Sequence, residues 1–274
     1  FQSQRKVYTM ADITDTVDLS VSPYEVGTGT NSVQLIGSGT NTAAGDYSAI
    51  VGGDKNEVGA TAEGSAILGG DANEIQTGVY NVIGGGTKNL VDGSSKDSYN
   101  GVFSGASNEI DCNWAASVIG GGSKNTMCDE VNSGKGNAAI AGGLENRFYI
   151  PAAAAASNSV FGGFIGGGLA NCIQDGPTAD FSFIGGGAGN DITSASYATI
   201  VGGSGNTNQC NNAHVIGSSI AATRIDATFV NALTFAPDLS GIPIAANNAA
   251  ALALVPAGSL YRSGADPDVV SIVH

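Results

Sequence analysis

The chain has few side chains that could act as a nucleophile or a general base. It has only two histidines, His214 and His274, and neither stands in a recognisable motif with a serine or cysteine. The sequence G-x-S-x-G, the turn that presents the nucleophilic serine in many hydrolases, does not occur. Acyl transfer needs a nucleophile beside a base. We therefore expect both histidines to be structural or surface residues.

Two pairs of carboxylates could in principle hydrolyse a glycosidic bond, which takes two carboxyl groups about 5 to 9.5 Å apart. Asp129 and Glu130 are neighbours, and Asp54 and Asp71 hold the same position in consecutive repeats. If the repeats stack, Asp54 and Asp71 lie roughly 5 Å apart. They could also offer oxygen to Ca²⁺, but no loop has the ligand density that this ion needs. We expect hydrated corners, no catalytic residue, no metal and no cofactor.

Four cysteines raise the question of disulfides: Cys112, Cys128, Cys172 and Cys210. Cys112 and Cys128 are in neighbouring repeats but one residue out of phase, which turns them to opposite faces of a strand. Cys112 and Cys210 share a phase but are at least five repeats apart, beyond the reach of a disulfide. We predict free, partly buried thiols.

The overall composition excludes several classes of partner. The formal net charge is −14, from 10 Lys and Arg against 24 Asp and Glu. Nucleic acid and anionic membranes attract clustered basic residues, and the chain has no such cluster. No apolar run reaches the roughly 18 residues of a transmembrane helix. We expect neither nucleic-acid binding nor membrane insertion.

A short repeat dominates the middle of the chain. Each copy has two apolar residues, a glycine-rich pair, two variable residues and an asparagine, as in VGGDKN or GGGTKN. Successive copies lie 15 to 25 residues apart, and an eleventh, degenerate copy follows at residues 215–219. The ten complete copies end at Asn41, Asn56, Asn73, Asn89, Asn108, Asn125, Asn146, Asn171, Asn190 and Asn206.

This spacing predicts an all-β, parallel β-solenoid. At about 3.3 Å per residue, 15 to 17 residues make one turn of two short strands and two corners. Apolar steps such as Ile50-Val51 and Ile200-Val201 are the expected strands. Stacking them would bury a column of branched side chains and pair each coil with its neighbours. With 42 glycines and only 7% aromatic residues, the core should be narrow.

Glycine and asparagine have a mechanical role in this prediction. A tight corner needs positive φ, which glycine adopts without penalty. Asparagine tolerates the left-handed region, and its amide can bond to the next coil as part of a ladder. The glycine-rich segments lack the G-K-[ST] of a phosphate-binding loop. We therefore predict that the ten asparagines are structural repeat corners.

The ten phased copies resemble the head repeats of trimeric autotransporter adhesins, and more closely the "IGGG…N" arrays of bacteriophage fibre proteins. The resemblance covers residues 31–221. It implies a left-handed β-roll of about eleven short coils, with three chains packed side by side as a homotrimer. The coils here are longer and more variable than the family's usual turn, so we expect the least regular stacking over residues 130–185.

The two ends differ from the repeat. Residues 1–30 are expected to be an N-terminal cap or attachment segment. Residues 222–274 are expected to hold a linker, a short helix at 245–254, and a β-hairpin from Ser259–Arg262 and Val269–His274. The ending G-S-L-Y-R-S-G resembles the C-terminal tips of phage structural proteins and not the membrane strands that end an autotransporter.

Together these features lead us to expect a non-enzymatic, extracellular structural protein. The favoured function is a virion fibre or spike of a bacteriophage, used for host attachment through a cell-surface receptor or glycan and held by other virion proteins. The alternative is a bacterial surface adhesin or extracellular filament subunit at the cell surface. A polysaccharide-degrading tailspike is less favoured, since no catalytic constellation is evident.

Overall fold

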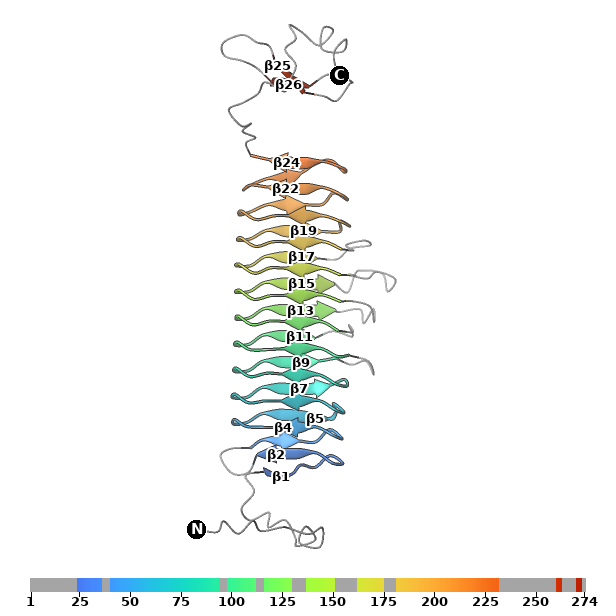
Figure 1. Ribbon diagram of the computed structural model, residues 1–274, viewed down its shortest axis with the longest axis vertical. Coiled ribbons are helices and arrows are strands. Elements are labelled where there is room, and N and C mark those ends of the chain that lie inside the picture. Colours follow the sequence, from blue (N-terminus) through green and yellow to red (C-terminus); the bar gives the residue numbers. More distant parts are fainter. Residues whose placement is uncertain are drawn as a thin grey trace, which may run out of the picture. The chain divides into compact units, whose positions relative to one another are not determined.

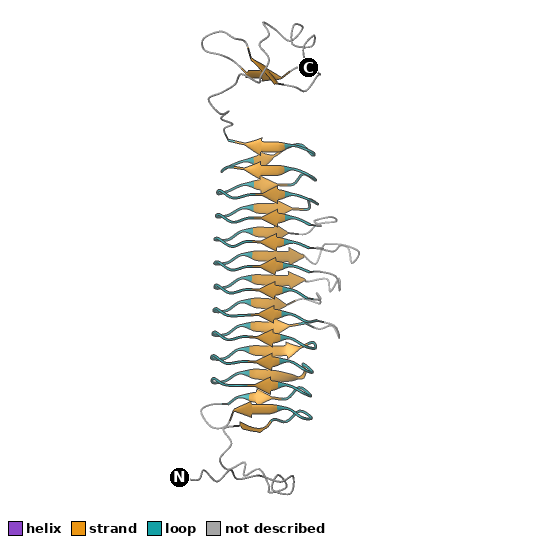
Figure 2. Cartoon of the chain, viewed as in Figure 1, coloured by secondary structure: helices purple, strands orange, loops and turns teal. Residues whose placement is uncertain are grey.

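The computed structural model describes residues 24–35, 40–93, 98–111, 116–129, 137–150, 162–174, 181–231, 260–262 and 270–272. The chain forms two compact units, Phe1–Asn231 and Ala232–His274. The described residues contain strands, turns and bends but no helix (Figure 1, Figure 2). In this part of the chain there is accordingly no helix long and apolar enough to cross a membrane.

The first unit is a stack of short strands in two sheets (Figure 1). The chain alternates between the sheets, so each coil adds one strand to each. Sheet A contains β1 (Tyr24–Val26), β2 (Val33–Leu35), β4 (Ala49–Ile50), β6 (Ala66–Ile67), β8 (Val82–Ile83), β10 (Gly101–Val102), β12 (Val118–Ile119), β14 (Ala139–Ile140), β16 (Phe164–Ile165), β18 (Phe183–Ile184), β20 (Thr199–Ile200), β22 (His214–Ile216) and β24 (Thr228–Val230).

Sheet B lies on the other side of the same coils. Its strands are β3 (Thr42–Ala43), β5 (Glu57–Thr61), β7 (Glu74–Thr77), β9 (Leu90–Asp92), β11 (Glu109–Asp111), β13 (Thr126–Asp129), β15 (Arg147–Ile150), β17 (Cys172–Gln174), β19 (Asp191–Thr193), β21 (Thr207–Asn208) and β23 (Ala221–Ala222). Neighbouring coils pair in parallel, for example Ile50 with Ile67 in sheet A and Ile110 with Met127 in sheet B. The predicted parallel β-solenoid is confirmed.

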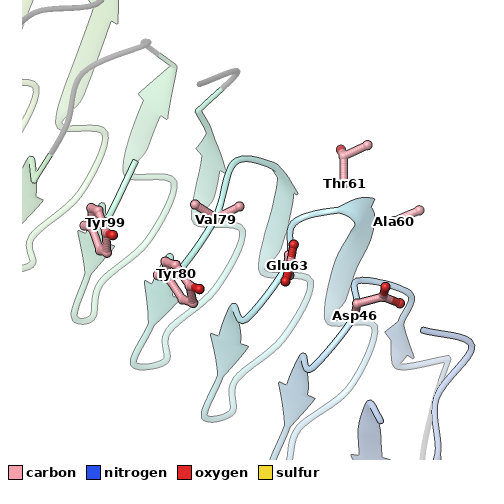
Figure 3. A pocket seen from close by; sticks show the side chains of 7 residues that line it. All are labelled: Asp46, Ala60, Thr61, Glu63, Val79, Tyr80 and Tyr99. Atoms are coloured by element: carbon pink, nitrogen blue, oxygen red, sulfur yellow. The ribbon is translucent and has the colours of Figure 1, made fainter. Parts of the chain in front are cut away.

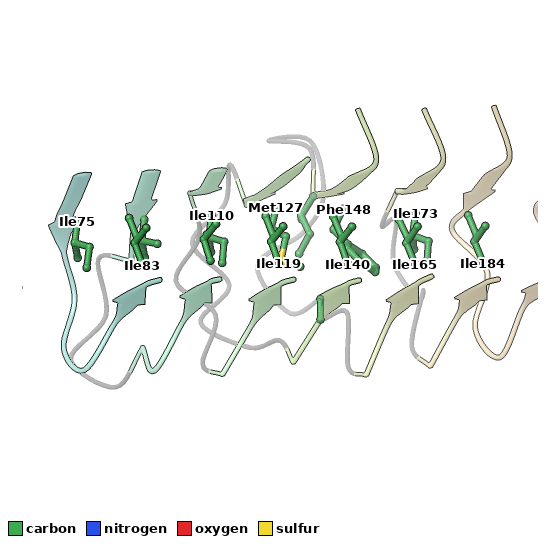
Figure 4. Close-up of a cluster of buried hydrophobic side chains, with 14 of the residues drawn as sticks. Ile75, Ile83, Ile110, Ile119, Met127, Ile140, Phe148, Ile165, Ile173 and Ile184 are labelled. Carbon is green, nitrogen blue, oxygen red and sulfur yellow. The ribbon is translucent and has the colours of Figure 1, made fainter. Parts of the chain in front are cut away.

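The core is a double column of apolar side chains between the sheets (Figure 4). Each coil places one residue from each sheet inside, such as Ile119 from β12 and Met127 from β13, and both are fully buried. Because strand side chains alternate, the residues before and after each core residue point outward. Single branched residues suffice to fill this narrow interior, which is why so few aromatic residues are needed.

Both ends of the stack differ from its middle. Strand β1 pairs antiparallel with β2 and so covers the first edge of sheet A, within the predicted N-terminal cap. An uncovered edge would invite pairing with other chains. At the other end, β24 pairs in parallel with β22, so stacking continues to Val230, beyond residue 221 where the sequence predicted its end. The repeat is hard to recognise there because this coil lacks the glycine pair and asparagine.

In the second unit, β25 (Leu260–Arg262) and β26 (Val270–Ile272) pair antiparallel, which confirms the predicted hairpin. The predicted helix at 245–254, and most of residues 1–30, lie outside the described residues.

Candidate functional site

The ten predicted asparagines form a continuous ladder at one corner of the coils, which we call the asparagine corner. All ten side chains are buried. From Asn73 to Asn206, each Nδ2 donates to the Oδ1 of the preceding asparagine at 2.8 to 3.2 Å. Asn41 joins the ladder through its Oδ1, which accepts the backbone N–H of Asn56 at 2.9 Å.

Asn125 shows how completely a ladder member is bonded. Its Nδ2 lies within hydrogen-bonding distance of the Oδ1 of Asn108 (3.0 Å) and the carbonyls of Gly121 (2.9 Å) and Gly143 (3.0 Å). Its Oδ1 accepts the backbone N–H and the Nδ2 of Asn146. Buried amides are stable only when bonded in this way. Every donor and acceptor of this side chain is therefore used inside the fold, and none is left for a ligand.

Glycine is required beside the ladder by close backbone approach. Gly70 has φ +96°, and a Cβ there would overlap the carbonyl oxygen of Gly86 in the next coil. From Asn56 onward, the residue just before each ladder asparagine also adopts the left-handed region, for example Lys55 at φ 54° and Lys124 at φ 54°. From Asn56 onward, each corner thus has two left-handed residues, a glycine and the residue before the asparagine, and the residue between them pairs with a neighbouring coil.

Of the carboxylates considered for catalysis, only Asp54 and Asp71 have side chains that the structure describes. Asp54 and Asp71 do stack, joined by a parallel bridge at the asparagine corner. Lys55 Nζ lies 3.1 Å from Asp54 Oδ2, and its own pKa is raised by that hydrogen bond and by the charges of Asp54 and Asp71. The other carboxylate oxygen of Asp54, Oδ1, is buried and has no hydrogen-bond partner, so this corner is only partly hydrated. Glu130 and the side chain of Asp129 lie outside the described residues.

The remaining chemically capable residues are scattered. Cys172 and Cys210 are half-buried free thiols, as predicted. Cys128 stands opposite Asp111 in the ladder of β11 and β13, one residue out of register with Cys112, which lies outside the described residues. His214 begins β22 and is exposed. Within the described ranges, no three metal-binding side chains come together.

Three further titratable groups, all in sheet B, have raised pKa values. Burial raises the pKa of Cys172 to about 12, and the neighbouring Asp191 adds to the shift. Burial also raises the pKa of Asp191, against the effect of its hydrogen bond from Thr193. The pKa of Glu109 is raised by burial and then by Asp111. These groups stand along one acidic face and do not converge on a cleft.

The outer face of sheet A is uncharged, in contrast to that of sheet B. From β4 to β20 the two outward positions flanking each core residue hold only Ala, Val, Gly, Leu, Phe and Thr. Leu68 and Phe103 are 52% and 58% exposed. Phe164 and Phe183 stack with ring centroids 5.6 Å apart. Sheet B instead presents Glu57 and, further along the stack, other charged side chains.

The second corner, between the end of sheet B and the start of sheet A, carries a column of aromatic residues; we call it the tyrosine corner. Its aromatic members have φ between 44° and 57° and expose more than half of their surface: Tyr47, Tyr80, Tyr99, Phe181 and Tyr197. Rings on consecutive coils stack, with centroids 5.4 Å apart for Tyr80 and Tyr99 and 5.5 Å for Phe181 and Tyr197.

Sequence reasoning missed the tyrosine corner, although a signal exists. Each aromatic residue lies three positions before a core residue of sheet A, as in Tyr47 to Ile50 and Tyr80 to Ile83. The glycines and the asparagine that define the repeat follow the core residue, whereas the aromatic residues precede it and are absent from several coils, as at Gly64 and Ala116.

Beside the tyrosine corner the surface has a hollow of about 640 Å³ (Figure 3). It is lined by residues of four consecutive coils: Asp46, Ala60, Thr61, Glu63, Val79, Tyr80 and Tyr99. Its size is in the range of small-molecule sites. It combines two carboxylates with two exposed tyrosine rings.

Comparison with known proteins adds no family to these observations. No protein-family model matches the chain, and no curated protein is similar to it.

Proposed function

We propose that this chain forms the shaft of a homotrimeric bacteriophage fibre or spike, placed on the virion and used for attachment to a host cell. The proposal has two parts, assembly and attachment. The uncharged outer face of sheet A supports the first part most directly, and the resemblance of the repeat to phage fibre arrays supports the second.

An uncharged face of this length favours packing against another protein surface. Soluble monomers rarely leave long apolar patches exposed, because each Å² removed from water contributes about 25 cal/mol. Glycine and alanine along sheet A allow close approach, and Leu68 and Phe103 supply larger contacts. Three copies around a threefold axis would cover this face equally in each chain. The acidic face of sheet B would remain in water, where its charge favours solubility.

Sedimentation equilibrium tests the assembly. We expect a particle of three times the 27.1 kDa chain mass. Leu68→Lys together with Phe103→Lys should shift the population to monomers, since buried unpaired ammonium groups are costly. The matched control is Gln76→Lys, which adds charge at an exposed position of β7 in sheet B. A monomeric wild-type chain, or trimers unaffected by the double substitution, would contradict the proposal.

Immunogold electron microscopy of the native source tests the placement. We expect antibodies against this chain to label slender projections on virus particles. Label confined to the bacterial envelope would instead identify a surface adhesin or extracellular filament, and would remove the virion part of the proposal.

A further inference from the structure

We infer that the hollow beside Tyr80 binds a segment of a neutral surface glycan. The inference rests on the proposed attachment function, for which it names a receptor class and a contact site. The hollow is formed entirely by the tyrosine corner and the adjoining ends of sheet B, away from the uncharged outer face of sheet A. Side-by-side packing through sheet A would leave it open to solvent.

The lining residues match the two kinds of surface that a sugar ring presents. Tyr80 and Tyr99 are 52% and 54% exposed, with near-parallel rings inclined at 16°. The face of an aromatic ring is electron-rich and attracts the slightly positive C–H groups of a pyranose. Val79 and Ala60 add apolar area beside these rings. Stacked tyrosines also lose little entropy on binding, because they are already held in place.

Asp46 and Glu63 supply acceptors for sugar hydroxyls. They hold the same position on consecutive coils, each directly before a member of the tyrosine corner, and both are exposed (Figure 3). Asp46 Oδ1 accepts the backbone N–H of Thr30 at 2.6 Å, which orients its second oxygen. Hydrogen bonds to an ionised acceptor are stronger than those between neutral groups.

The same carboxylates select against acidic glycans. A uronate, sialic acid or phosphorylated sugar would bring a negative charge beside two others, on a chain whose net charge is already −14. Like charges at about 4 Å repel by roughly 1 kcal/mol even in water, and by more near a protein surface. Of the surface glycans, neutral ones are therefore the class that this hollow accepts.

Two local departures from the regular coil create the hollow. Where its neighbours have tyrosine, the second coil has Gly64, and a Cβ there would lie only 2.6 Å from the ring of Tyr80. On the same coil, β5 bulges relative to β7, since Val58 pairs with Ile75 but Thr61 pairs with Thr77. Bulges turn side chains to new directions and are frequent beside functional sites. Gly64 leaves the corner without a side chain on this coil, and the bulge places Ala60 and Thr61 along one side of the hollow.

The experiment uses the full chain on a printed array of neutral and anionic bacterial polysaccharides, followed by calorimetric titration with the best neutral glycan. We expect binding to at least one neutral glycan and none to the anionic set. Tyr80→Ala should weaken the titrated affinity at least tenfold. The variant should fold, because Ala116 holds the equivalent position with φ 57°. Glu63→Gln keeps the shape and should weaken binding severalfold.

Tyr197→Ala is the matched control. Tyr197 has the same corner position, a stacked ring and 55% exposure, but it follows Ser196 and lies outside the hollow. It should leave the affinity unchanged. Equal losses from Tyr80→Ala and Tyr197→Ala would place binding on the aromatic column in general and overturn the assignment to the hollow. Absence of any neutral ligand on the array, or a preference for anionic glycans, would also overturn it.

The outcome is separable from that of the proposed function. A trimeric virion protein that binds no neutral glycan would refute this site alone. A chain that binds a neutral glycan through Tyr80 but sediments as a monomer would refute the assembly and retain the site.

Discussion

The two corners of the solenoid differ in how much their number of residues varies from coil to coil. At the asparagine corner, the ladder asparagine lies six positions after the core residue of sheet A in the nine copies from Asn56 to Asn206, as from Ile50 to Asn56 and from Ile119 to Asn125. At the tyrosine corner, the path from the asparagine to the next core residue varies from 9 residues (Asn41 to Ile50) to 19 (Asn146 to Ile165). All the variation in coil length is therefore taken up on one side.

Hydrogen bonding explains this difference. The asparagine corner is a closed network whose members bond to the coils on both sides, so an extra residue would break several buried bonds at once. At the tyrosine corner, the buried residue two positions before the core residue of sheet A differs in type between coils, as with Ser65, Asn100 and Ala138. The Nδ2 of Asn100 and the Oγ of Ser117 have no partner there. One corner thus sets the register of the stack, and the other accommodates the differences in coil length.

The largest expected effect comes from changing coil length at each corner. Two glycines inserted between Ser123 and Lys124 should cost on the order of 5 kcal/mol, because the ladder bonds of Asn125 and its neighbours are lost. The same insertion after Gly93, in the path leading to the tyrosine corner, should cost only about 0.5 kcal/mol of loop entropy. Urea unfolding followed by circular dichroism measures both. Comparable losses from the two insertions would show that the corners do not differ.

A smaller effect is expected from single amides at the two corners. Asn125→Ala should cost about 3 kcal/mol, since it leaves the buried N–H of Asn146 and the carbonyl of Gly121 without their amide partner. Asn100→Ala should cost about 1 kcal/mol, because that side chain makes one bond, from the N–H of Ser117.

Thermal unfolding of both variants provides the measurement. Both variants lose the same side-chain volume, so Asn100→Ala is the control for that loss. Alanine is compatible with the position of Asn100, because Ala138 and Ala198 occupy it on other coils. A larger loss at Asn100 than at Asn125 would reverse our ranking of the corners.

The sequence predicted the structural features that the copies of the repeat share and missed the features that differ from coil to coil. Nine copies with one spacing to the asparagine were enough to predict the strands, the narrow core and the corner at Asn125, because each of these copies has the same local geometry. The hollow depends on one extra residue near Thr61 and one glycine, Gly64, on a single coil. In the sequence, the extra residue shows only as a spacing of 17 residues from Asn56 to Asn73, next to a spacing of 16 residues from Asn73 to Asn89. Handedness and the trimer stay predictions, since they come from the resemblance.

A further contrast between the two sides of the coil comes from two of the cysteines, Cys172 and Cys210. Cys172 follows Asn171 directly at the asparagine corner, and its pKa is raised from 9.0 to about 12. Cys210 lies in the variable path to the tyrosine corner, where its Sγ is 3.4 Å from the carbonyl oxygen of Ala222. Since only the thiolate is alkylated, the raised pKa should slow modification of Cys172 at pH 8 about a thousandfold relative to the unfolded chain.

Timed alkylation with iodoacetamide, read by peptide mass mapping, tests this, with the urea-unfolded chain as the reference and Cys210 as the internal comparison. Because burial disfavours the thiolate in the fold, the contribution of Cys172 to stability is complete below pH 9. It is lost as the pH rises from 9 towards 12, where the unfolded chain ionises first. Cys172→Ser should flatten that alkaline slope. Equally fast modification of Cys172 in folded and unfolded chains would mean that the stack next to the ladder opens readily, and the asparagine corner would then no longer qualify as the rigid side of the coil.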